Sequence, residues 1–216
     1  MKLLGITAAV LALWLGLTAE CAAQIITTVV GTGAGGYSGD GAAATNAGLN
    51  SPYGVAVDTA GNLFIVEDGC RIRRVDAATG IITTVVGDGN CGFTGDGGAA
   101  AAARIGNPRH VIVAGNGDLY INDWGNSRIR KVEAATGVIS TYAGNGSSGS
   151  GGDNGPATAA QLEAPQGLVL LPNGDLLISQ DNRIRCVLAD RGLMHVIAPE
   201  NRKPIQVISW ESIRRI

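Results

Sequence analysis

The sequence predicts an all-β fold, and three observations lead to this prediction. Glycine is abundant, at 33 of 216 residues, with no collagen-like period, which is typical of a chain with many turns. Apolar residues make up 45% of the chain, enough for a core, while aromatic residues reach only 4%. Most informative, the chain repeats itself at a constant interval, so one structural unit is built several times.

One heptapeptide marks the repeat most clearly. IITTVVG begins at Ile25 and again at Ile81, and the related VISTYAG begins at Val138. Other positions keep the same spacing, namely Pro52, Pro108, Pro165, Leu63, Leu119 and Leu176. The units therefore span about 25–80, 81–137 and 138–192.

Each unit begins with a Gly-rich loop and a short Ala-rich stretch, which allows one or two helical turns (42–49, 98–105 and 157–162). Four short segments follow, in the first unit YGVAVD, NLFIVED, RIRRVD and GIITTVVG. They alternate in polarity or are β-branched, and turn sequences such as TAGN and AATG separate them, which predicts strands joined by hairpins. Four short antiparallel strands in each repeated unit indicate the blades of a β-propeller.

The runs SPYGVAVDTAGNLFIVEDG, RIRRVD and GIITTVVG resemble the NHL repeat, as does DLYINDWGNSRIRKVEAATGVISTYAG in the second unit. The resemblance is to exported bacterial-type repeats that carry a GYSGDG-containing insertion, and it covers about Ile25–Gly192. It implies a propeller, usually of six blades, and by itself implies no reaction.

Three blades do not close a ring, so we expect an incomplete propeller. The chain is either a fragment of a longer propeller or one half of a homodimer that completes the ring. We favour the fragment, because residues 193–216 form a glycine-free tail without a recognisable unit, although Leu193–Ile197 can still supply a closing strand.

The first 23 residues have the pattern of a secretory signal. Lys2 precedes the apolar run Leu3–Leu17, and small residues at Cys21 and Ala23 fit cleavage before Gln24. The alternatives are a retained anchor, for which the run is short, or a lipidated Cys21. We expect a protein that is secreted or at the cell surface or in the periplasm, with no membrane span after signal removal.

Blade geometry suggests one disulfide. The turn between the second and third strands lies on the same face as the long connection between blades, so Cys70 and Cys91 are expected to meet there. Cys186 has no cysteine in the equivalent loop of its unit, so we expect a buried or stranded thiol.

The recurring loop YSGDG, FTGDG and SGGDN has two interpretations. Asp40, Asp96 and Asp153 either present carboxylates to a ligand, beside Tyr37 and Phe93, or fix their own turns and cap the helical turn that follows. We favour the structural role, because a ligand site is usually built once. A calcium site would need several oxygen ligands together.

The third strand of each unit carries arginines. RIRRV and RIRKV alternate, so Ile72 and Ile129 are expected to face the core and the arginines to face outward, as a solvated surface or as a basic rim. His110 stands where the other units have Gly54 and Gly167, and we expect it at the rim. The candidate rim residues are Tyr37, Asp40, Arg71, Phe93, Asp96, His110, Arg128 and Asp153.

We expect no enzyme and no cofactor. Loops such as GTGAGG match a dinucleotide fingerprint, but they recur in every unit and do not open a helix. The two histidines, His110 and His195, lie in different units, which disfavours a metal site, and the net charge of −2 disfavours nucleic acid. The predicted function is an exported, non-catalytic scaffold that binds a protein, peptide or glycan at its rim. The alternatives are a fragment of a metal-dependent lyase or lactonase-like propeller, or a purely structural cell-surface repeat protein.

Overall fold

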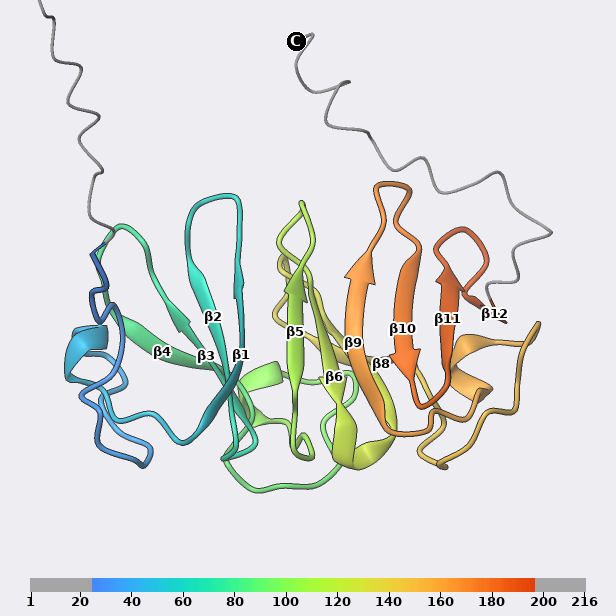
Figure 1. The fold of residues 1–216 in the computed structure, drawn as a ribbon, viewed down its shortest axis with the longest axis horizontal. Helices are drawn as coiled ribbons and strands as arrows, with labels where there is room; N and C mark the ends of the chain where they lie inside the picture. The colour runs from blue at the N-terminus through green and yellow to red at the C-terminus, as the bar shows by residue number, and fades with distance from the viewer. Residues whose placement is uncertain (1–24, 197–216) are drawn as a thin grey trace, which may run out of the picture.

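The computed structural model describes residues 25–196. The predicted signal at 1–23 and the tail beyond residue 196 therefore lie outside the described residues. Three four-stranded sheets stand side by side (Figure 1), each with its strands in chain order. The architecture is all-β with three blades, as the repeat predicted.

Each blade is an antiparallel meander. The first contains β1 (Pro52–Val57), β2 (Leu63–Glu67), β3 (Arg71–Val75) and β4 (Ile82–Val86). The second contains β5 (His110–Val113), β6 (Leu119–Asp123), β7 (Arg128–Val132) and β8 (Ile139–Ala143). The third contains β9 (Pro165–Leu170), β10 (Leu176–Gln180), β11 (Arg183–Leu188) and β12 (Leu193–Val196).

The turns between the first and second strands of each blade lie on the face opposite to the long connections (Figure 1). The β1–β2, β5–β6 and β9–β10 turns are at the top of Figure 1, and the connections between blades run along the bottom. We call the lower side the long-connection face. Its Ala-rich pieces form single 3-10 turns, η1 (Ala44–Asn46), η2 (Ala100–Ala102) and η4 (Ala157–Ala159), and η3 (Trp124–Asn126) follows β6. No helix within residues 25–196 is long and apolar enough to cross a membrane.

The glycine before each loop aspartate has a specific steric role. Gly39, Gly95 and Gly152 have φ of 84°, 88° and 91°. A Cβ on Gly95 would lie 2.8 Å from the Cα of Ala103, and the other two glycines are equally crowded by their alanines. The loop can therefore fold back onto the Ala-rich turn only with glycine at this position.

The core lies between consecutive blades. Phe64, Val66 and Ile72 of the first blade join Val111 and Ile121 of the second in one buried cluster. A second cluster joins the second blade to the third in the same way. Each blade thus covers the apolar face of its neighbour, and Ile72 and Ile129 are core residues as predicted.

Candidate binding face

A fully buried arginine occupies the same position in each blade. The side chains of Arg73, Arg130 and Arg185 are 0% exposed. Each one pairs with a loop aspartate; the ion pairs are Arg73–Asp40 at 2.6 Å, Arg130–Asp96 at 2.6 Å and Arg185–Asp153 at 2.5 Å. The expectation that these arginines face solvent is wrong, because the long connection covers that side of the sheet.

The same guanidinium groups also hold the loop backbone. Arg73 donates to the carbonyl oxygens of Ser38 and Gly48, which belong to opposite ends of its loop. Arg130 does the same with Thr94 and Arg104. Each arginine therefore fastens a long connection to the blade into which it leads.

The loop aspartates are engaged on both oxygens in the first two blades. Tyr37 donates its hydroxyl to Asp40 at 2.8 Å, and the Thr84 N–H donates to the same oxygen at 2.9 Å. Burial alone would raise the pKa of Asp40, but hydrogen bonds from Thr84 and Tyr37 and the charge of Arg73 outweigh it and lower that pKa. Asp96 accepts a similar bond from the Thr141 hydroxyl at 2.7 Å.

This geometry favours the structural role of the loop aspartates, through a mechanism that differs from the predicted one. The 3-10 turns begin after Ala43, Ala99 and Pro156, and none of these turns has a side-chain cap. The expected capping by Asp40, Asp96 and Asp153 is therefore wrong. Each of them pairs with an arginine on the third strand of its blade, and Asp40 and Asp96 also accept a bond from the fourth strand.

A second acidic group lies behind the arginine in two blades. Glu67 and Asp123 end the second strands and are buried, 3.6 Å and 3.5 Å from Arg73 and Arg130. Burial raises the pKa of Glu67, and it raises the pKa of Asp123 to about 6. The third blade has the uncharged Gln180 here. These two carboxylates were not predicted as site residues, although each ends an otherwise apolar strand segment, LFIVE or LYIND, which is a signal in the sequence.

Two loop aromatics lie against arginines at the start of the third strands. The Arg71 guanidinium is 3.9 Å from the ring centre of Tyr37, and that of Arg128 is 3.8 Å from Phe93. Both arginines also donate to loop carbonyl oxygens. The structure thus brings four predicted rim residues together on the long-connection face, in two separate pairs. The third repeat has Ser150 instead of an aromatic.

His110 lies between blades rather than at the rim. It begins β5, and its Nδ1 accepts a hydrogen bond from the N–H of Leu168 in β9 at 3.2 Å. Burial lowers the pKa of His110. A neutral imidazole therefore joins the innermost strands of the second and third blades.

The predicted Cys70–Cys91 disulfide is confirmed, with the two Cα atoms 5.3 Å apart. It connects the β2–β3 turn to the long connection on the same face. Cys186 is buried on β11, opposite His195 of β12.

Arg109, which was not among the residues predicted for the site, lies near two aromatic rings on the long-connection face. The Arg109 guanidinium carbon is 4.2 Å from the ring centre of Trp124 and 5.7 Å from that of Tyr53. Tyr53 is 57% exposed. Within residues 25–196, Arg109 forms no ion pair, unlike the blade arginines. We call Tyr53, Arg109 and Trp124 the arginine–aromatic patch.

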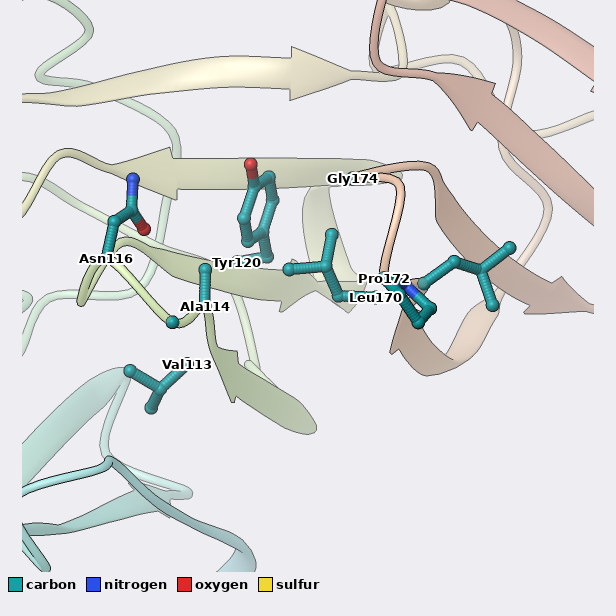
Figure 2. A pocket seen from close by; sticks show the side chains of 9 residues that line it. Val113, Ala114, Asn116, Tyr120, Leu170, Pro172 and Gly174 are labelled. Atoms are coloured by element: carbon teal, nitrogen blue, oxygen red, sulfur yellow. The ribbon is translucent and has the colours of Figure 1, made fainter. Parts of the chain in front are cut away.

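A hollow of about 520 Å³ lies on the opposite face, between the hairpin turns of the second and third blades. Figure 2 shows Tyr120 with Leu170 and Pro172 on one side and Asn116 on the other. Tyr120 packs edge-on against Tyr142, with ring centres 4.9 Å apart, and burial raises the pKa of Tyr142 to about 12. No residue predicted for the site lines this hollow.

The described residues contain no cluster of three or more His, Cys, Asp or Glu side chains placed to hold a metal ion. The loop carboxylates point to their arginines, and His110 faces Leu168. The chemistry on the long-connection face is therefore that of cations beside aromatic rings.

Part of the chain is similar to known repeat proteins. Residues 26–92 match the teneurin NHL domain. Human Teneurin-4 is 38% identical over 100 residues, which are 40% of this chain and 4% of that protein. The SUPPRESSOR OF QUENCHING 1 protein of Arabidopsis thaliana is 28% identical over 134 residues, 58% of this chain and 12% of that protein. The chain therefore spans only a small part of these relatives.

Solved structures agree on the fold. An auxiliary nutrient binding protein from Bacteroides ovatus superposes with a TM-score of 0.52 and 18% identity, over 72% of this chain and 39% of that one. A protein of unknown function from Bacteroides thetaiotaomicron gives 0.51 and 16%, over 68% and 35%. The repeats of this chain are thus similar to NHL repeats, and they fold as three blades of a β-propeller, a partial ring.

Proposed function

We propose that the chain is a non-catalytic binding module that takes a carboxylate-bearing ligand, a peptide or an acidic glycan, at the arginine–aromatic patch. The observation that supports this proposal is the environment of the Arg109 guanidinium. This guanidinium is near two aromatic rings, and within the described residues it forms no ion pair with a carboxylate.

The chemistry of the patch suits such a ligand. A guanidinium presents paired N–H donors that match a carboxylate, and neighbouring rings hold it in place. Tyr53 belongs to β1, whereas Arg109 precedes β5 and Trp124 follows β6. The patch therefore exists only when the first two blades pack together.

A binding screen tests the proposal. Acidic peptides and uronic-acid glycans are titrated calorimetrically into the protein, with their uncharged amide analogues as ligand controls. For any ligand that binds, Arg109→Gln should weaken affinity at least tenfold, about 1.4 kcal/mol. The matched control is Arg183→Gln, an exposed arginine that has no aromatic contact. If Arg109→Gln and Arg183→Gln bind equally well, the patch is not the site.

We propose also that the protein is exported. The signal pattern at 1–23 supports this, and the Cys70–Cys91 disulfide is of a kind that persists in oxidising compartments. N-terminal sequencing of protein recovered from a secreting host should begin at Gln24. Retention of Lys2 in the recovered protein would contradict cleavage.

The catalytic and the purely structural alternatives predict different results. Stoichiometric zinc or calcium in the purified protein would favour a metal-dependent lyase or lactonase-like propeller. A folded protein that binds nothing in the screen would favour a structural repeat.

A further inference from the structure

The first blade has an open face. Val55, Val111 and Leu168 hold equivalent register positions, since they pair with Ile65, Ile121 and Ile178. Val111 is 1% exposed and Leu168 3%, because a preceding blade covers each of them. Val55 is 63% exposed.

The third blade has the complementary open face. Ile72, Ile129 and Ile184 are equivalent, each the second residue of a third strand. Ile72 and Ile129 are 0% exposed under the following blade, but Ile184 is 51% exposed. The open ends are thus the two halves of an interface that the chain already forms twice within itself.

Within the described residues, one segment with the sequence of an outer strand belongs to none of the three sheets. Residues 25–31 read IITTVVG, identical to residues 81–87, which contain β4. Residues 25–30 form no strand, and three of their apolar side chains face solvent, with Ile25 84%, Ile26 98% and Val29 68% exposed, while Val30 packs against the first blade. By the repeat, this segment is the fourth strand of a blade that precedes β1.

The third blade lacks a group that this segment contains. Arg73 pairs in register with Thr84 and Arg130 with Thr141, but Arg185 pairs with Val196. The Thr84 N–H and the Thr141 hydroxyl donate to the Oδ2 atoms of Asp40 and Asp96, the oxygens that do not face the arginine. Within the described part of the chain Asp153 has the Arg185 ion pair and accepts no such bond from β12. Thr28 is the residue of IITTVVG that matches Thr84.

We propose that two copies of the chain associate head to tail. The Val55 face of one copy packs on the Ile184 face of the other, and residues 25–30 of the first copy replace β12 beside β11 of the second. This is strand addition to a sheet edge, and the bond from Thr28 to Asp153 completes the third blade. Two such contacts, related by a two-fold axis, close a ring of two sets of three blades.

Solution mass tests the two faces. Light scattering on the full chain should give two copies for the wild type, and one copy for Val55→Asp or Ile184→Asp alone. An equal mixture of the two variants should regain two-copy complexes, because one contact between intact faces remains. Both positions are exposed within one copy, so circular dichroism should show that each variant keeps its fold.

Three results would overturn the proposal. The wild type could remain a single copy at every concentration, or the mixture could fail to associate, which would mean that the Val55 face does not bind the Ile184 face. Open-ended polymers would rule out ring closure.

A separate pair of variants tests the strand. Thr28→Val removes the hydroxyl and should raise the dissociation constant of the dimer about tenfold, as expected for a hydrogen bond to a charged group. Thr27→Val is the matched control, since its counterpart Thr83 is exposed. Equal effects of the two substitutions would exclude the Thr28–Asp153 contact.

Discussion

Individual buried charged side chains hold the long connections of this protein against its blades. A guanidinium with no solvent contact is costly unless its partners are in place, and here each one has a loop aspartate and loop carbonyl oxygens. The second blade adds Asp123, which accepts from the Gly106 N–H and from Asn126. In this blade the pKa of Asp123 is raised and the pKa of His110 is lowered, so both residues should make the stability of the folded state depend on pH.

Asp123 should make the folded state less stable as the pH rises. Its pKa of about 6 is above its ordinary value of 3.8, because burial disfavours the charged form. The stabilising contribution is complete below pH 3.8 and is lost as the pH rises through 6. Asp123→Asn should therefore gain stability relative to wild type between pH 4 and 7, on the order of 3 kcal/mol. Urea unfolding across this range measures the difference, and a pH-independent difference would contradict it.

His110 should make the folded state less stable as the pH falls, which is the opposite of the effect of Asp123. Its pKa is lowered by burial, so its contribution is complete above the ordinary value of 6.5 and is lost as the pH falls toward the folded pKa. His110→Ala leaves the Leu168 N–H without its acceptor, at a cost of about 1–2 kcal/mol near pH 7.5. The difference in unfolding free energy between His110→Ala and the wild type should be smaller at pH 5, as measured by urea unfolding. A gap that widens at low pH would show that the imidazole binds as a cation.

Among the structural elements, the long connections are the least regular and the most strongly held. The two connections between described blades contact the blade before them through their first residues and the blade after them through their aspartate. The connection that contains Cys91 has in addition a covalent link to the β2–β3 turn, across 21 residues.

Removal of this disulfide should destabilise the protein without changing the sheets. Closing a loop of this size contributes about 3 kcal/mol in the chain-entropy estimate. The double variant Cys70→Ser/Cys91→Ser should lose about that amount in urea unfolding, and reduction of the wild type should reproduce the loss. Reductant should leave the double variant unchanged. If reductant lowers the stability of the wild type and of the double variant equally, the loss does not come from the Cys70–Cys91 disulfide.

For the whole molecule, the repeat made the fold predictable from the sequence. Turn pairs such as TAGN and strand-length apolar segments recur in a fixed order, and such local chemistry sets hairpins. The Cys70–Cys91 bridge followed from the face on which blade turns lie. These features depend on the blade itself.

Features that depend on what covers a blade were not predictable. RIRRV alternates like a half-exposed strand, and the sequence does not show that a distant loop lies over Arg73. The position of Arg109 between Tyr53 and Trp124 likewise needs two blades to be packed together. The same limit applies to His110, whose partner Leu168 is in the next unit.

The central claim is that the aspartates of the recurrent loops have a structural role, because they pair with buried arginines of the blades. A double-mutant cycle on Asp96 and Arg130 tests it most directly, with unfolding free energies of Asp96→Asn, Arg130→Leu and the double variant. We expect a coupling of about 1–3 kcal/mol, since these groups form a charge-assisted contact at 2.6 Å. Free energies that add to within about 0.5 kcal/mol would contradict the account.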